Sequence, residues 1–124
     1  MPRILDVGQC GLDHGSISRH LTRAYHAEVA DASTAAEALK TLRAGKFDLV
    51  LVNRLLDRDG SPGLDLIRAL KADPDLADLP VMLVSNYPEA QREAQSLGAL
   101  PGFGKADLRS PTIPALQVAL AAPG

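Results

Sequence analysis

The chain has 124 residues, of which 46% are hydrophobic and 23% are charged, and its formal net charge is −2. This length suits a single domain with a sizeable core, and the composition excludes a disordered chain. The weak negative charge gives no electrostatic reason to expect nucleic acid or an anionic membrane as a partner. The absence of Trp and the low aromatic content of 3% also leave no platform on which single-stranded bases could stack.

Cysteine content and hydropathy indicate a reducing compartment and no membrane insertion. Cys10 is the single cysteine, so no disulfide forms within the chain. The first residues do not resemble a signal peptide, and no apolar run approaches the length that spans a bilayer. We therefore expect a cytoplasmic protein that forms one domain over residues 1–124.

Short apolar runs alternate with amphipathic stretches along the chain. The apolar runs predict five strands, at 3–8, 26–31, 46–53, 81–85 and 100–104. The amphipathic stretches predict five helices, at 16–25, 34–45, 61–72, 88–98 and a last one that starts at Pro111 or Pro114 and runs to about Ala121. Residues 9–15, which are rich in glycine, are predicted to form a loop. This alternation indicates an α/β fold in which a parallel sheet carries helices on both faces, because right-handed crossovers place them there.

Local signals support the second helix and the central strand. Thr34 and Glu37 form a capping box at the start of that helix, and Gly45 stands where it should end. The apolar run 49–52 is too short for a helix and is typical of a strand buried on both faces. Asn53 follows it at the carboxyl end of the strand. In parallel sheets, binding and catalytic residues lie at this end of the strands.

Three local patterns give the chain a resemblance to the receiver domain of bacterial response regulators. FDLVLVN, residues 47–53, stands where receivers have a strand that ends in the phosphoacceptor aspartate. VMLVS, residues 81–85, stands where they have a strand ending in Ser or Thr, and GALPGFGK, residues 98–105, matches a Gly-Ala pair followed by the receiver lysine, here Lys105. The run 66–85 is also typical of the family. The resemblance covers nearly the whole chain and implies a single flavodoxin-like (βα)5 domain with strand order 2-1-3-4-5.

The residues that match the reactive site of receivers lack its negative charge. The phosphoacceptor position holds Asn53, and the acidic pair that binds magnesium is matched by Gly8 and Gln9. Ser85 and Lys105 match the two switch residues. Phosphoryl transfer needs a carboxylate nucleophile and a cation held by charged oxygens, and an amide cannot form an acyl phosphate. We therefore predict no phosphorylation at Asn53, no magnesium or other metal, no cofactor and no enzymatic activity.

The absence of these acids also leads to predictions for the hydrogen bonds and the conformation of the pocket. Lys105 is expected to turn to the carbonyl of Asn53, to backbone oxygens or to solvent, because a buried ammonium without a partner is costly. Asn53, Gln9 and Ser85 are expected to hydrogen-bond to one another. The aromatic switch position of the fifth strand falls on Gly102. These changes predict a domain that stays in one conformation.

These departures favour a pseudo-receiver, which would act in two-component signal transduction or a phosphorelay without being phosphorylated. The resemblance implies a protein partner on the face formed by the fourth helix, the fifth strand and the fifth helix, and a second copy of the chain is one candidate. Polar residues give the fourth helix an outer surface that is either such a partner face or a solvated one: Glu89, Gln91, Arg92, Glu93 and Gln95. We expect no attached output domain, so any effect would pass through another chain.

The sequence leaves two alternatives open. The first is a domain that senses a small ligand or anion in the crevice around residues 8–15, Asn53 and Lys105, where a glycine-rich loop would lead into a helix N-terminus. The second is a working receiver in which Asp57 or Asp59 replaces the missing acids, although the pattern D-x-D-G is common turn chemistry.

Overall fold

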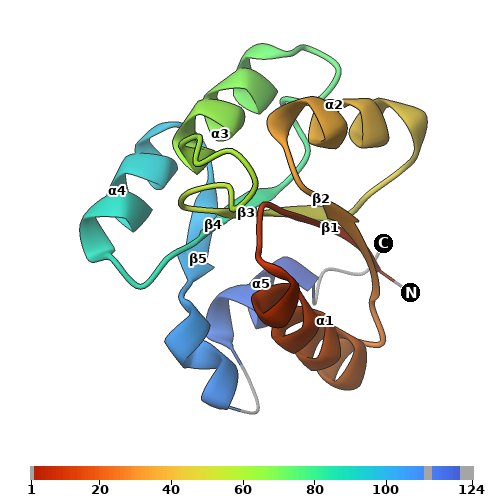
Figure 1. Cartoon of the computed structure of the whole chain (residues 1–124), viewed down its shortest axis with the longest axis vertical. Coiled ribbons are helices and arrows are strands. Elements are labelled where there is room, and N and C mark those ends of the chain that lie inside the picture. Colours follow the sequence, from red (N-terminus) through yellow and green to blue (C-terminus); the bar gives the residue numbers. More distant parts are fainter. Residues whose placement is uncertain (1, 111–112, 121–124) are drawn as a thin grey trace.

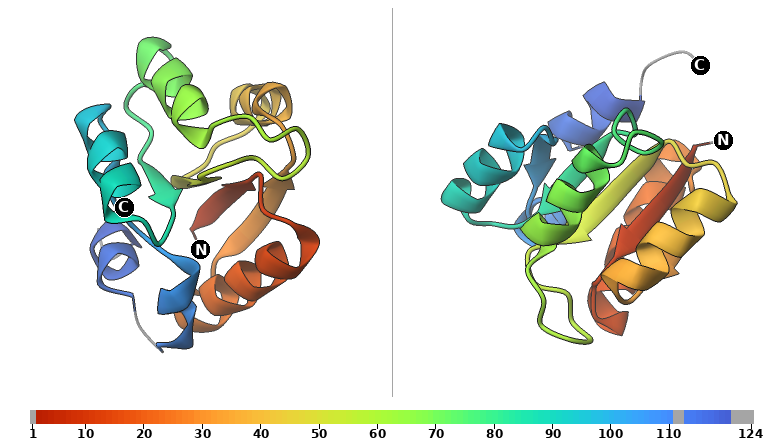
Figure 2. Two further views of the ribbon diagram at one scale, coloured as in Figure 1. Left: turned by 60° about the vertical axis from the view of Figure 1, so that its left-hand side comes forward. Right: turned by 90° about the horizontal axis from the view of Figure 1, so that it is seen from above.

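The computed structural model describes residues 2–110 and 113–120 of the chain. A five-stranded parallel sheet lies at its centre, with helices on both faces (Figures 1 and 2). The strand order is β2-β1-β3-β4-β5, as predicted. The elements in chain order are β1 (Arg3–Val7), α1 (Gly11–Tyr25), β2 (Glu28–Ala32), α2 (Ala35–Ala44), β3 (Leu49–Asn53), α3 (Gly63–Ala72), β4 (Val81–Val84), α4 (Pro88–Ser96), β5 (Leu100–Phe103), the 3-10 helix η1 (Lys105–Arg109) and α5 (Pro114–Leu120).

The central strand β3 sends alternate side chains into two cores. Val50 and Val52 belong to the core beneath α2, α3 and α4, while Leu49 and Leu51 belong to the core beneath α1 and α5. All four are fully buried, which confirms the prediction of a strand covered on both faces. Figure 1 shows the two groups of helices on opposite sides of the sheet. Because β1, β3 and β4 are parallel neighbours, their carboxyl ends lie side by side.

The start of α2 follows the predicted capping pattern. The hydroxyl oxygen of Thr34 accepts a hydrogen bond from the backbone N–H of Glu37 at 3.2 Å. The carboxylate of Glu37 returns to accept from the N–H of Ser33 at 2.7 Å, one residue earlier than in the simplest capping box. Gly45 closes the helix as predicted, in an extended conformation (φ −146°) that does not itself require glycine.

The predicted loop at residues 9–15 is wrong, because α1 begins at Gly11. Cys10 is extended and takes the N-cap position, and its carbonyl accepts the first helical hydrogen bond, from the N–H of His14. Asp13 lies in the first turn, where a carboxylate is stabilised by the helix dipole. Ile17 and Leu21 are fully buried along this helix, and their burial outweighs the low helix propensity of glycine near the start. The crevice expected around residues 8–15 therefore lacks the glycine-rich loop that was expected to form it.

Other predicted boundaries shift by one to three residues, and two of these shifts fall at the starts of β2 and α3. β2 starts at Glu28, because His26 adopts a left-handed conformation (φ 54°) that closes α1. α3 starts at Gly63, after an extended N-cap residue at Pro62. Both shifts leave the order of elements unchanged.

The C-terminal part contains an element that the sequence did not predict. After β5 the chain forms η1, and α5 follows from Pro114. The alternative start at Pro111 and the predicted end at Ala121 lie outside the described residues. Neither α5 nor any other described helix is long and apolar enough to cross a bilayer.

Candidate functional site

The predicted site residues meet at the carboxyl edge of the sheet. Asn53, Ser85 and Lys105 line one small pocket of about 200 Å³. The residue after β1, Gly8, is joined to this pocket because its carbonyl accepts a hydrogen bond from the side-chain amide of Asn53 at 3.2 Å. Gln9 is buried beside it, and its side-chain amide has no hydrogen-bond partner among the described residues. The structure therefore places all five predicted residues at this edge.

The amide of Asn53 is held by the backbone around it. Its nitrogen donates to the carbonyl of Gly8 and, at 2.8 Å, to the carbonyl of Leu55. Ser85 is also held locally, since its hydroxyl oxygen accepts from the N–H of Tyr87 at 3.1 Å. The expectation that Asn53, Gln9 and Ser85 hydrogen-bond to one another is therefore wrong. Backbone groups satisfy Asn53 and Ser85 instead.

The position of Gly8 is closed to an acidic side chain. Gly8 has a φ of +79°, a conformation that residues with a Cβ rarely adopt. A Cβ placed there would overlap the side chain of Leu56 and lie 2.9 Å from its Cα. Leu56 is buried in the core and cannot move aside without repacking. One member of the receiver's acidic pair is therefore excluded by packing as well as absent from the sequence.

Lys105 makes an ion pair that the sequence did not predict. Its Nζ donates to the carboxylate of Asp13 at 2.8 Å. This hydrogen bond lowers the pKa of Asp13, and the thiol of Cys10 donates to the same oxygen at 3.3 Å. The expectation that Lys105 turns to Asn53, to backbone oxygens or to solvent is wrong. Asp13 lies in the stretch that the sequence predicts to be a loop, and only its place in the first turn of α1 reveals it as the partner.

A second polar cluster lies under α1, outside the predicted site. Asp6, in the middle of β1, is 0% exposed, and its carboxylate lies 2.7 Å from Nδ1 of His14. Asp31 of β2 lies 3.8 Å from the same nitrogen. Burial raises the pKa of Asp6 to about 6, although the contact with His14 acts in the opposite direction. The sequence signal for this cluster is Asp6 itself, because a charged residue is unusual in the middle of a predicted strand. The described residues contain no group of three or more His, Cys, Asp or Glu side chains that could hold a metal ion.

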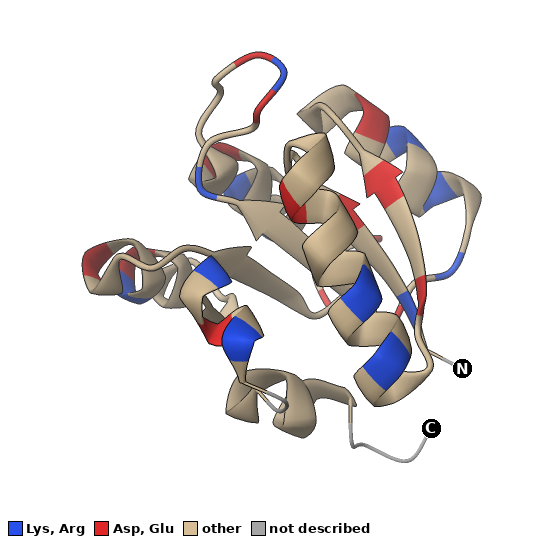
Figure 3. Ribbon diagram, turned by 60° about the horizontal axis from the view of Figure 1, so that its bottom comes forward, with Lys and Arg blue, Asp and Glu red and all other residues tan. Residues whose placement is uncertain are grey.

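The two acids of the loop after β3 lie in an exposed turn. Asp59 accepts hydrogen bonds from the backbone N–H and the hydroxyl of Ser61, which lower its pKa. Asp57 is exposed, and its backbone N–H donates to the carbonyl of Gly8. Figure 3 shows this loop, with red and blue residues at its tip, extending away from the sheet. The turn interpretation of D-x-D-G is confirmed.

The aromatic switch position of receivers is replaced here by a contact between α4 and β5. A Cβ on Gly102 would overlap the carbonyl oxygen of Leu83, so the position requires glycine. Gln91 of α4 fills the space, donating to the carbonyls of Leu83 and Ser85 at 2.9 and 3.1 Å and accepting from the N–H of Gly102 at 3.1 Å. The prediction of a polar outer surface at Glu89, Gln91, Arg92, Glu93 and Gln95 is therefore wrong at Gln91, which points inward.

Comparisons with known proteins agree with this fold. No protein-family model matches the chain. A stretch of 64 residues is 38% identical to the chemotaxis protein CheY of Pseudomonas aeruginosa and covers 52% of the chain and 48% of that protein, so the match spans about half the length of each.

Solved structures match over a larger share of the chain. The bacteriophytochrome response regulator AtBRR has a TM-score of 0.78 and 23% identity, covering 100% of this chain and 95% of that protein. The chemotaxis response regulator CheY4 of Vibrio cholerae has a TM-score of 0.76 and 21% identity, covering 97% and 99% respectively. These similarities establish that the chain has the fold of a response-regulator receiver domain.

Proposed function

We propose that this chain, which has the fold of a response-regulator receiver domain, is a pseudo-receiver. It takes part in signal transduction by contacting a protein partner, and it does so without being phosphorylated. The observation that carries this proposal is the amide of Asn53, which stands at the end of β3 and donates to the carbonyls of Gly8 and Leu55. An amide in this position offers no nucleophilic carboxylate for phosphoryl transfer.

The surroundings of Asn53 support the same proposal. Magnesium gains most of its affinity from carboxylate charge, and neither Gly8 nor Gln9 supplies any. Leu56 occupies the space that an acid at position 8 would need. The ammonium group of Lys105, which would contact a phosphoryl group, forms an ion pair with Asp13 of α1 instead. The chain is accordingly proposed to bind no metal or cofactor at this pocket and to have no enzymatic activity.

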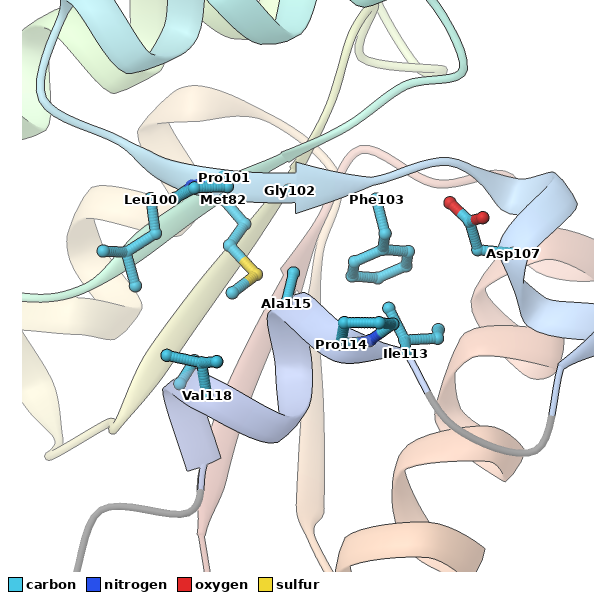
Figure 4. Close-up of a pocket in the computed structure, with 11 residues that line it drawn as sticks. Met82, Leu100, Pro101, Gly102, Phe103, Asp107, Ile113, Pro114, Ala115 and Val118 are labelled. Carbon is cyan, nitrogen blue, oxygen red and sulfur yellow. The ribbon is translucent and has the colours of Figure 1, made fainter.

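An apolar hollow beside β5 and α5 supports a partner face in this region. The hollow has a volume of about 470 Å³, and Figure 4 shows the side chains of Leu100, Met82 and Val118 around it. Val118 is 79% exposed and Leu100 is 37% exposed. Exposed apolar side chains around a hollow are typical of surfaces that another protein covers. We place the partner contact, including contact with a second copy of the chain, on this face.

Phosphorylation can be tested directly by intact mass measurement. The protein is incubated with acetyl phosphate and magnesium, and we expect no added phosphoryl group. Amide spectra recorded with magnesium and then beryllofluoride should show no saturable shifts near Asn53, Ser85 or Lys105. A mass increase that disappears in Asp57→Asn or Asp59→Asn would identify a working receiver that uses the loop acid, and the proposal would be wrong.

The second candidate, an anion-sensing domain, needs a different location from the one that the sequence suggested. Gly11 and Gly15 are helical, so no glycine-rich loop surrounds the pocket of Asn53. Lys105 lines that pocket, but it also lines a second and more basic cleft on its other side.

A further inference from the structure

We propose that the cleft between α1 and η1 binds a small anion that carries two or more phosphate groups. The cleft has a volume of about 310 Å³, close to the lower end of the range for small-molecule sites. This site goes beyond the proposed function, because it needs neither phosphorylation nor the partner face beside α5.

Basic side chains from two distant parts of the chain line this cleft. Arg19 and Arg23 come from successive turns of α1, and Lys105 and Arg109 come from the two ends of η1. Figure 3 shows the blue segments of α1 next to those of η1. A concentration of positive charge in one cleft is unexpected in a chain whose net charge is −2. It makes this part of the surface positively charged, opposite in sign to the net charge of the chain.

Most of this positive charge is not neutralised by the protein. Within residues 2–110 and 113–120, Arg19, Arg23 and Arg109 form no ion pair, and the side chain of Arg19 reaches only the hydroxyl of Ser16, at 3.5 Å. Asp13 also lines the cleft, and its carboxylate is engaged by Lys105. Three guanidinium groups therefore face a shared space with no carboxylate left for them. Like charges gathered in this way favour a bound anion.

The chemistry of the lining defines the class of ligand. Each guanidinium presents a planar fork of donors that matches two oxygens of a phosphate group. Three guanidinium groups carry three positive charges, so a diphosphate or triphosphate balances them better than a single phosphate, whose charge near pH 7 is about −1.5 to −2. The volume of the cleft, about 310 Å³, suits a small molecule. Leu108, which also lines the cleft, adds an apolar contact for the organic part of such a ligand.

Lys105 would connect this cleft to the pocket of Asn53, since it lines both. An anion in the cleft competes with Asp13 for the ammonium group of Lys105. Binding would therefore loosen the ion pair that holds Lys105 and change the surroundings of Asn53. The site provides a route by which a soluble anion could alter the pocket without phosphorylation.

The test is calorimetric titration of the whole chain with inorganic pyrophosphate at low ionic strength and without magnesium. We expect saturable binding that weakens by at least about tenfold in Arg19→Gln and in Arg23→Gln, since each loses a charge-assisted bidentate contact. Both arginines are exposed, so these variants should fold normally. Arg92→Gln, which removes an exposed arginine on α4, is the matched control and should bind as the wild type does. Asp13→Asn should strengthen binding, because it removes the acid and releases Lys105.

Several results would overturn the proposal. Absence of saturable binding would do so, as would equal loss of affinity in Arg19→Gln and Arg92→Gln, which would indicate non-specific attraction to basic residues. Amide spectra should show shifts in α1 and η1, and shifts confined to Asn53 and Ser85 would place the anion in the other pocket. These results are independent of the acetyl phosphate experiment, so the failure of one proposal does not decide the other.

Discussion

Lys105, at the start of η1, and Asp13, in the first turn of α1, form an ion pair in which Nζ lies 2.8 Å from Oδ2. The two residues are 92 positions apart, so the pair ties α1 to the segment that follows β5. It gives the lysine an acidic partner from a helix in place of one from a strand end. The pocket around Asn53 can therefore lack carboxylates without leaving this ammonium unpaired.

The first prediction concerns the strength of this pair. Both side chains are 33% exposed, so solvent screens the interaction and Asp13→Asn should lower the free energy of unfolding by only about 0.5–1 kcal/mol. Urea unfolding at neutral pH in low and high salt measures it, and the loss should shrink at high salt. Asp65→Asn, which removes an exposed pair with Arg68 on α3, is the control and should cost less. A loss of several kcal/mol would mean that the pair is structurally essential.

The second prediction tests whether the acidic pair can be rebuilt. Gly8→Asp should lower the free energy of unfolding by more than about 3 kcal/mol, because the positive φ and the clash with Leu56 add together. Gly8→Ala, which adds the Cβ without charge, should lose most of the same amount. Gly11→Ala is the matched control, since nothing lies within 4 Å of its Cβ, and it should be neutral or stabilising by up to about 1 kcal/mol. A Gly8→Asp protein as stable as wild type and able to bind magnesium would contradict this account of the pocket.

Much of the fold could be predicted because its signals are local. The run Leu49 to Val52 identifies a doubly covered strand from composition and length alone. The capping residues Thr34 and Glu37 mark the start of α2 to within one residue. The start of α1 was missed for an equally local reason. Gly11 and Gly15 suggest a loop, and only the burial of the rest of the helix, a tertiary effect, outweighs them.

The site was predicted less completely because its contacts are long-range. The positions of Asn53, Ser85 and Lys105 follow from the order of strands, which the sequence pattern predicts. Their hydrogen-bond partners do not follow from it. The pairing of Lys105 with Asp13 depends on how α1 and η1 pack, and Gln91 reaches β5 only because Gly102 leaves room for it. Spacing along the chain carries no information on such contacts.

The third prediction concerns the link between α4 and the sheet. Gln91→Ala should lower the free energy of unfolding by about 2–3 kcal/mol, because it leaves the carbonyls of Leu83 and Ser85 without their side-chain donor. Gln91→Glu should also destabilise, since a carboxylate can accept from Gly102 but cannot donate to the carbonyls. Chemical denaturation measures both variants. Gln95→Ala, at an exposed position of the same helix, should change little. Equal effects at positions 91 and 95 would show that the inward contact is unimportant.

The fourth prediction is a pH dependence that arises from Asp6. Burial raises the pKa of Asp6 from 3.8 to about 6 in the folded protein, so between these values the native state binds more protons than the unfolded state. The contribution of Asp6 to stability therefore falls as pH rises through about 4 to 6 and stays low above that range. The size of this effect is about 3 kcal/mol, from roughly two pKa units.

Asp6→Asn tests this contribution, because an amide keeps the shape and a hydrogen bond to His14 without the charge. The difference in unfolding free energy between Asp6→Asn and wild type should grow in favour of the variant between pH 4.5 and pH 7. The other charged group near His14 is Asp31, whose side chain is exposed. The difference in unfolding free energy between Asp31→Asn and wild type should therefore change much less over the same pH range. A constant difference for Asp6→Asn across this range would mean that Asp6 ionises normally in the folded protein.

The fifth prediction concerns the apolar hollow beside α5. Val118 is 79% exposed at its rim, so Val118→Asp should leave the midpoint of thermal unfolding nearly unchanged while placing a charge where a partner would pack. We expect wild-type protein to self-associate at high concentration in sedimentation velocity experiments and Val118→Asp to remain monomeric. Leu12→Asp is the matched control, since Leu12 is also 79% exposed but lies on α1, away from the hollow, and this variant should associate as wild type does. Loss of association in both variants would indicate general hydrophobic adhesion, and association that persists in Val118→Asp would remove a second copy of the chain as the partner of this face.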